Sequence, residues 1–149
     1  ILLERNYDEV TLEREEDCRR WAEELSLKGR RSVVLTGVTL EPGRIGAVCF
    51  DRAAGRTEMV AAPQVEGSFH GTGDLFASVL TGALVRGMDL SAAASLAADF
   101  TARCAERTAA QNYPTREGVD FEPLLWRLGA EFAEKAGAIP AHTEREERP

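Results

Sequence analysis

The stretch Ser32-Val33-Val34-Leu35-Thr36-Gly37 decides the fold class that the sequence predicts. Its apolar, β-branched centre ends at a Thr-Gly pair, which is typical of a buried parallel strand whose carboxyl end opens into a crevice. Residues 11–28 precede it and place apolar side chains at helical spacing opposite a charged face, with Gly29 as a C-terminal stop. A helix that leads into such a strand predicts an α/β fold.

Two more strands are predicted farther along the chain. Residues 44–50 and 57–62 flank the polar, glycine-containing segment 51–56, so we expect an antiparallel hairpin toward the edge of the sheet. Residues 64–70 are expected to be irregular. A glycine turn then begins the helical part of the chain.

Three helices are predicted after that turn. The first covers residues 74–86 and carries a continuous apolar stripe, and the second covers residues 91–110. The third begins near Glu122, with Pro123 in its first turn. The second helix is expected to turn four side chains inward, namely Leu96, Ala97, Phe100 and Cys104.

The ends of the chain differ from this regular part. Residues 1–137 are expected to form one domain, and residues 138–149 are charged without an apolar face and are expected to be a flexible tail. The sequence starts at Ile1 in an apolar helical run without an initiator Met, which favours a chain cut from a longer one.

Composition excludes several classes of function. The net charge of −7 and the pI of about 4.9 disfavour binding to nucleic acid or anionic membranes. They do not disfavour ATP, because backbone amides and a helix N-terminus bind phosphate whatever the net charge. Three widely spaced cysteines predict neither a disulfide framework nor a metal site and suit a reducing cytoplasm. No apolar run approaches the roughly 20 residues of a membrane span.

The segment Gly71-Thr72-Gly73-Asp74 is the strongest candidate for chemistry. Two glycines at a helix start let backbone N–H groups converge on a phosphate or a developing anion. A carboxylate in the first helical turn could then accept a proton from an attacking hydroxyl. A tight turn with Asp74 as a helix-dipole partner explains the same spacing without function. Neither a Rossmann nor a P-loop fingerprint is present.

The segment Gly71-Thr72-Gly73-Asp74-Leu75-Phe76-Ala77 resembles the GTGD-L-F-A segment of pyridoxal kinases in the ribokinase superfamily. The likeness extends through residues 78–107 in helix pattern, and backward to Val34-Leu35-Thr36-Gly37. Gly118-Val119 also fits the family. The resemblance implies the C-terminal portion of a ribokinase-like, three-layer α/β/α fold, with a central sheet and helices packed on it.

The resemblance also implies a reaction. It is the ATP-dependent phosphorylation of the 5′-hydroxymethyl group of pyridoxal, pyridoxine or pyridoxamine, which gives pyridoxal 5′-phosphate or its vitamers in vitamin B6 salvage. Asp74 would contact this substrate and act as the catalytic base. The amides of Gly71, Thr72 and Gly73 would stabilise the transferring phosphoryl group. Mg²⁺ would accompany ATP, and a requirement for K⁺ stays open.

Four more residues are assigned to the nucleotide by the resemblance. Thr36 and Gly37 would contact the ATP phosphates, and Val65 and Glu66 would line the adenine pocket. The family takes most of its ring contacts, its dimer-forming strands and its carboxylates near Mg²⁺ from the N-terminal half. The full-length protein is therefore expected to be a homodimer, and the isolated chain of 149 residues to be inactive.

Two alternatives stay open. The first is a hydroxymethylpyrimidine kinase or another small-molecule kinase of the ribokinase family. Hydroxymethylpyrimidine kinases also tend to carry a histidine where His70 lies, but they have Cys at the position of Asp74, which favours pyridoxal kinase. His70 itself suits a loop histidine without catalytic duty better than a substrate contact. A different class of function is a non-catalytic fragment that binds nucleotide or a partner.

Three polar helical residues, Asp99, Glu106 and Thr108, are predicted to be solvated or capping groups.

Overall fold

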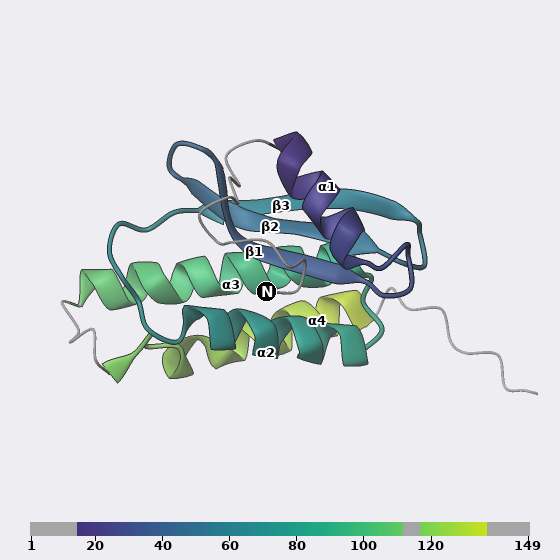
Figure 1. Cartoon of the computed structure of the whole chain (residues 1–149). Coiled ribbons are helices and arrows are strands. Elements are labelled where there is room, and N and C mark those ends of the chain that lie inside the picture. Colours follow the sequence, from purple (N-terminus) through teal and green to yellow (C-terminus); the bar gives the residue numbers. More distant parts are fainter. Residues whose placement is uncertain (1–14, 112–116, 137–149) are drawn as a thin grey trace, which may run out of the picture.

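The computed structural model describes residues 15–111 and 117–136. The predicted tail over residues 138–149 and the start at Ile1 lie outside the described residues. Figure 1 labels the α-helices and strands along the chain, and the short 3-10 helix precedes α4. They are α1 (Glu15–Leu25), β1 (Val33–Glu41), β2 (Arg44–Asp51), β3 (Arg56–Pro63), α2 (Thr72–Val85), α3 (Leu90–Ala110), the 3-10 helix η3 (Glu122–Leu124) and α4 (Leu125–Ala136).

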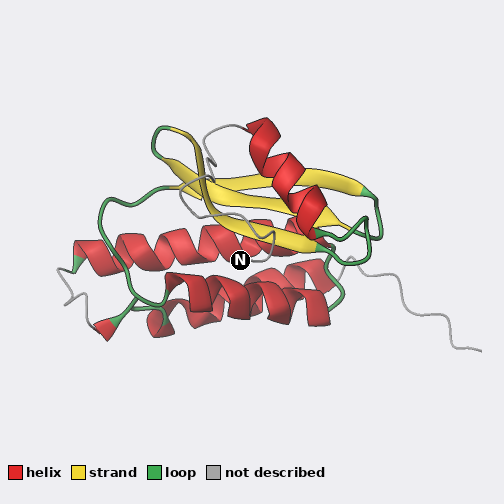
Figure 2. Ribbon diagram, viewed as in Figure 1, coloured by secondary structure: helices red, strands yellow, loops and turns green. Residues whose placement is uncertain are grey.

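The elements form three layers. The strands make one antiparallel sheet in the order β1-β2-β3, with α1 on one face and α3 on the other. Helix α2 packs beside α3, and α4 lies on the same side of the sheet (Figures 1 and 2). The predicted α/β/α architecture, with a central sheet and helices packed on it, is therefore confirmed.

The first strand departs from its prediction. It was predicted to be a buried parallel strand, but β1 pairs antiparallel with β2 and lies at one edge of the described sheet, with Val33, Val34 and Leu35 only partly buried. Val34 packs against the α3 side, whereas Val33 and Leu35 pack against the α1 side. A strand covered by helices on both faces is apolar throughout, whichever way its neighbour runs. The apolar run therefore did not specify the direction of pairing.

The predicted hairpin is confirmed, and it brings two backbones into close contact. Strands β2 and β3 pair from Arg44↔Pro63 to Asp51↔Arg56, and the turn closes where Asp51 accepts from the amide of Gly55 at 2.8 Å. A Cβ atom at Gly46 would lie 1.9 Å from the carbonyl oxygen of Val60. Glycine is therefore required at position 46 for these strands to meet.

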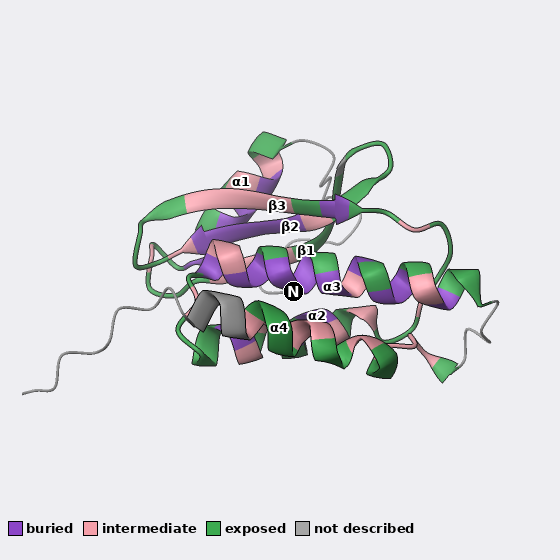
Figure 3. Cartoon of the chain, turned by 180° about the vertical axis from the view of Figure 1, so that it is seen from behind, coloured by how far each residue is buried: buried purple, intermediate pink, exposed green. Residues whose placement is uncertain are grey.

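The helices follow their predicted apolar patterns, with shifted ends. Helix α1 ends at Leu25 instead of residue 28, because the Ser26 hydroxyl donates to the Glu23 carbonyl at 2.6 Å and accepts from the Gly29 amide at 2.9 Å. Helix α2 begins at Thr72, two residues before the predicted start. The four side chains expected to face inward from α3 are all buried, and Figure 3 shows the buried face of that helix against the sheet.

Candidate functional site

A bulge interrupts β1 at the predicted phosphate-contacting residues. The pairing register with β2 shifts between Thr36 and Val38, and Gly37 adopts a left-handed φ of 76°. A bulge leaves the extra residue outside the ladder and turns its backbone away from the neighbouring strand. Thr36 and Gly37 are both exposed, and a Cβ atom at Gly37 would meet nothing within 4 Å. Their backbone is therefore open to a ligand.

The glycine turn begins α2. Gly71 is the N-cap residue with a φ of 86°, which strongly favours glycine, and its carbonyl accepts from the Leu75 amide at 2.9 Å. The Thr72 hydroxyl donates to the Phe69 carbonyl at 3.1 Å, so it holds the preceding loop. The first N–H groups of a helix have no intrahelical acceptor, and no side chain of the described residues caps those of α2. The turn therefore presents unsatisfied donors at the positive end of a helix.

Gly73 is a glycine that the fold itself does not require. It lies inside the first turn of α2 without a left-handed φ, and a Cβ atom there would meet nothing within 4 Å. Glycine within a helix is less stable than alanine by up to about 1 kcal/mol. The open space beside Gly73 leaves room for a ligand to approach the backbone closely.

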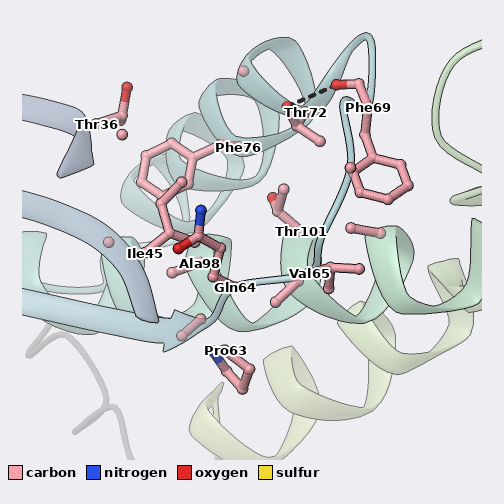
Figure 4. Close-up of a pocket in the computed structure, with 17 residues that line it drawn as sticks. Thr36, Ile45, Pro63, Gln64, Val65, Phe69, Thr72, Phe76, Ala98 and Thr101 are labelled. Carbon is pink, nitrogen blue, oxygen red and sulfur yellow. Dashed lines mark hydrogen bonds between the residues drawn. The ribbon is translucent and has the colours of Figure 1, made fainter. Parts of the chain in front are cut away.

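A first cavity, of about 280 Å³, joins the bulge to the glycine turn. Figure 4 shows it between the strands, the loop after β3 and helices α2 and α3. Five of the residues predicted to contact nucleotide or phosphate line it, namely Thr36, Gly37, Val65, Thr72 and Gly73. Glu66 is exposed and is not among its lining residues. None of the described side chains that line it is charged, so among these residues backbone groups and the α2 N-terminus dominate its electrostatics.

Sequence reasoning missed the other walls of this cavity. Phe69 and Phe76 contribute aromatic rings, and Ala98, Thr101 and Ala102 come from one face of α3. Apolar residues at helical spacing are typical of a core face, and the buried alanines of α3 do belong to the main core. The small side chains at these positions were the available signal, because they leave space where larger ones would fill it.

A second cavity, of about 540 Å³, lies against the same turn. It is lined by His70, Gly71 and Asp74, and by the loop and helix over residues 117–132. Consecutive residues of the turn thus contribute to different cavities, because Thr72 and Gly73 line the first one. A group held at this turn would be reachable from both.

Asp74 lines the second cavity and has no side-chain partner among the described residues. It is exposed, and its carboxylate makes no hydrogen bond or ion pair with the described residues. Its backbone carbonyl accepts from the Ser78 hydroxyl at 2.8 Å, which holds the helix and not the carboxylate. The Asp74 side chain is therefore available to a substrate. His70 is exposed and lines the same cavity.

The loop over residues 117–121 is held in place by a buried threonine. Thr108 is 3% exposed, donates to the Cys104 carbonyl at 2.7 Å and accepts from the Asp120 amide at 2.9 Å. The prediction that Thr108 is solvated or capping is therefore wrong, because its partner comes from a loop that sequence periodicity does not reveal. Asp99 and Glu106 are exposed, as predicted.

An ion pair supports the same loop. The Arg107 Nε atom lies 2.7 Å from the Asp120 Oδ2 atom. With its amide oriented to satisfy both partners, Gln111 donates to Asp120 at 3.0 Å and accepts from Arg107 at 2.8 Å. The loop carries Gly118, where an added Cβ atom would lie 3.4 Å from the His70 carbonyl oxygen. This cluster therefore fixes one wall of the second cavity.

The cysteines belong to the core. Cys18, Cys49 and Cys104 are free and buried. Burial, reinforced by Glu58, raises the pKa of Cys49 to about 11, and burial, reinforced by Asp120, raises the pKa of Cys104 to about 11. Such thiols are poor nucleophiles near neutral pH. In residues 15–111 and 117–136, no group of three or more potential metal ligands occurs, and no helix is long and apolar enough to cross a membrane.

Comparisons with known proteins place this site in context. A family model for phosphomethylpyrimidine kinase matches residues 5–117. None of the curated protein sequences matches the chain. The structure of a candidate phosphomethylpyrimidine kinase from Bacteroides thetaiotaomicron, in an orthorhombic form with pyridoxal, has a TM-score of 0.74 and 30% identity, over 85% of this chain and 44% of that one. Its rhombohedral form has a TM-score of 0.75 and 27% identity, over 95% of this chain and 45% of that one.

Pyridoxal kinases are also similar, as the sequence predicted. The enzyme from Lactobacillus plantarum has a TM-score of 0.67 and 28% identity, over 76% of this chain and 41% of that one. The enzyme from Entamoeba histolytica, at 18% identity and a TM-score of 0.65 over 80% of this chain and 42% of that one, shares the fold. The chain spans less than half the length of each of these structures.

Proposed function

Because the chain belongs to the phosphomethylpyrimidine kinase family, we propose that it is the nucleotide-binding and base-bearing part of an ATP-dependent small-molecule kinase. The observation that carries the proposal is the position of the glycine turn between two cavities. Thr72 and Gly73 line the first cavity, and Gly71 and Asp74 line the second. A phosphoryl group held there is accessible to a donor on one side and to an acceptor on the other.

The first cavity is proposed to hold the nucleoside end of ATP. Its volume of about 280 Å³ is near the lower end of the range of roughly 300–1,000 Å³ for small-molecule sites, so it would take part of the nucleotide. The triphosphate would leave it along the Thr36–Gly37 bulge and end at the first amides of α2. Val65 would contact the base from the loop after β3, and the assignment of Glu66 to the same pocket stays a prediction.

Transfer at the turn then follows from elementary chemistry. The hydroxyl oxygen of the acceptor attacks the γ-phosphorus, the bond from that phosphorus to the β–γ bridging oxygen breaks, and ADP leaves. Asp74 accepts the hydroxyl proton as this bond forms. The amides of Gly71, Thr72 and Gly73 stabilise the charge on the transferring group. The Asp74 carboxylate suits this role because it is exposed and no described residue forms a hydrogen bond or ion pair with it.

Mg²⁺ is proposed to arrive with the nucleotide. The described residues contain no group of three or more potential ligands, and the family resemblance assigns the carboxylates near Mg²⁺ to the N-terminal half. The ion would neutralise charge on the phosphates beside a cavity whose described lining residues include no cationic side chain. A requirement for K⁺, a homodimeric full-length protein and a cytoplasmic location stay predictions.

The acceptor is proposed to be pyridoxal, pyridoxine or pyridoxamine, phosphorylated at the 5′-hydroxymethyl group. Support comes from Asp74, and from the similarity to a structure determined with pyridoxal at 30% identity. Hydroxymethylpyrimidine is an equally supported acceptor, because the matching family model is that of phosphomethylpyrimidine kinase. A non-catalytic, nucleotide-binding role for the chain alone is the third possibility.

Substrate profiling separates these possibilities. A version of the protein extended to the length of its solved relatives is assayed with Mg-ATP and either pyridoxal or hydroxymethylpyrimidine, by chromatographic detection of the phosphorylated product. The proposal predicts a higher kcat/KM for pyridoxal. Preference for hydroxymethylpyrimidine would overturn the acceptor assignment, and ATP binding without any transfer would favour the non-catalytic role.

A further inference from the structure

The Thr101 hydroxyl is an anomaly in the wall of the first cavity. Its oxygen is shielded from solvent and has no hydrogen-bond partner among the described residues. Buried polar groups are nearly always paired, so an unpaired one in a native structure calls for an explanation. Thr101 comes from α3 and lines the first cavity, and Figure 4 shows it projecting toward the side where Thr72 lies.

Other hydroxyls on the same helices show what Thr101 lacks. Ser78, Thr81 and Thr108 each donate to the carbonyl oxygen four residues earlier, at 2.8, 2.7 and 2.7 Å. The corresponding acceptor for Thr101 would be the Ala97 carbonyl, and no such bond forms. Local helix geometry therefore does not account for a hydroxyl at position 101, where valine would have the same shape.

The surroundings explain why a polar group would be useful at this position. The neighbouring lining residues on α3 are Ala98, Ala102 and Ala105, and the facing wall carries Phe76. These side chains offer dispersion contacts to a ligand but no directional ones. A threonine in a helix has two accessible side-chain rotamers, so rotation about its Cα–Cβ bond can turn the hydroxyl toward a ligand without moving the helix.

We infer that Thr101 is a specificity-determining residue that takes its hydrogen-bond partner from the nucleoside part of the bound nucleotide. The inference rests on the proposed function, which places a nucleotide in the first cavity. The base and the ribose both carry suitable groups, whereas the phosphates are assigned to the bulge and the α2 N-terminus. The hydroxyl stays unpaired in the protein alone and gains its partner on binding.

This role has a signature that a structural role does not have. The isosteric change Thr101→Val removes a buried, unpaired hydroxyl, so it should raise the melting temperature of the 149-residue chain by ~2–4 °C. The same change at Thr108, on the same helix, removes two hydrogen bonds and should lower the melting temperature. Thr108→Val is therefore the matched control for the sign of the effect.

Calorimetric titration of the 149-residue chain supplies the second readout. Thr101→Val should raise the Kd for Mg-ATP about 3- to 10-fold, as loss of one hydrogen bond implies. The Kd for the magnesium complex of inorganic tripolyphosphate, which has no nucleoside, should not change. Together with the higher melting temperature, this pattern supports the inference.

Three results would overturn it. A lower melting temperature for Thr101→Val would show that the hydroxyl has a structural partner. Equal ATP affinity for the variant and the wild-type chain would remove Thr101 from the nucleotide contacts and leave the proposed function standing. Absence of Mg-ATP binding by the wild-type chain would instead overturn the proposed use of the first cavity, and this inference with it.

Discussion

Asp74 lines the second cavity, whereas Asp120 belongs to the loop that forms one of its walls, and the two carboxylates differ in their partners. The Asp120 side chain is 17% exposed and pairs with Arg107, while its backbone amide donates to the buried hydroxyl of Thr108. Asp74 is exposed and pairs with no described residue. The polar groups around Asp120 are therefore bonded to one another. At the glycine turn, the first amides of α2 and the Asp74 carboxylate have no partner among the described residues.

This difference separates stability from function. A paired group contributes to the free energy of unfolding, and its removal leaves a partner without its bond. An unpaired group that lies at a helix start and lines a cavity contributes little to folding and is available to a ligand. Changes near Asp120 should therefore act mainly on stability, and changes in the turn mainly on binding and turnover.

The largest effect is expected from Asp74→Asn. In a version extended to the length of the solved kinases, turnover should fall by roughly 10²-fold or more with nucleotide affinity nearly intact, because a general base is lost. The free energy of unfolding of the 149-residue chain should change by no more than about 0.5 kcal/mol, since only an exposed helix-end charge is removed. Steady-state kinetics with pyridoxal and urea denaturation measure the two quantities. Near wild-type turnover would remove Asp74 from its role.

Two glycines test the same separation. Gly46→Ala places a Cβ atom 1.9 Å from the Val60 carbonyl oxygen, so it should lower the free energy of unfolding by about 2 kcal/mol. Gly73→Ala meets no protein atom within 4 Å and should leave the melting temperature equal or higher. It should nevertheless weaken Mg-ATP binding about 10-fold, because the added methyl group enters the space assigned to phosphate. Unchanged ATP affinity in Gly73→Ala would argue against that assignment.

A smaller effect is expected from Asp120→Ala. Loss of the pair with Arg107 should lower the free energy of unfolding by about 1 kcal/mol, a modest value because the Arg107 side chain is 36% exposed. Arg107→Met and the double variant complete a cycle that isolates the coupling between the two side chains. Urea denaturation measures all four proteins. Additive effects in the cycle would show that the ion pair contributes nothing.

Alkaline pH tests the buried thiols. Burial raises the pKa of Cys49 and of Cys104 from 9.0 to about 11, so the folded state holds these protons more tightly than the unfolded state. The contribution of these two thiols to stability should therefore be constant below about pH 9 and fall as the pH rises from about 9 to about 11. Urea denaturation across this range is compared with Cys49→Ala, in which the fall should be smaller. An unchanged pH slope in that variant would contradict the assignment to Cys49.

The local parts of the fold could be predicted from the sequence, and the contacts between distant segments could not. The helix of residues 91–110 and the hairpin followed from apolar periodicity and a polar turn, because both signals lie within one segment. The direction of β1 depends on its partner strand. The Thr108–Asp120 bond joins a helix to a loop, so periodicity carried no sign of it.

The candidate site shows the same division. The glycine turn and Asp74 were found from the sequence because turn glycines and a following carboxylate are adjacent along the chain. The α3 wall of the first cavity was missed, since Ala98 and Ala102 have the pattern of a core face. Thr101 was missed because only the structure shows that its hydroxyl has no partner.

The central claim, that the first cavity and the glycine turn hold the nucleotide, is tested most directly by NMR. The ¹⁵N-labelled 149-residue chain is titrated with the magnesium complex of a non-hydrolysable ATP analogue, and backbone amide shifts are followed. The account predicts the largest changes at Gly71, Thr72 and Gly73, with further changes at Gly37. Shifts confined to the α1 face of the sheet, with the turn amides unmoved, would contradict it.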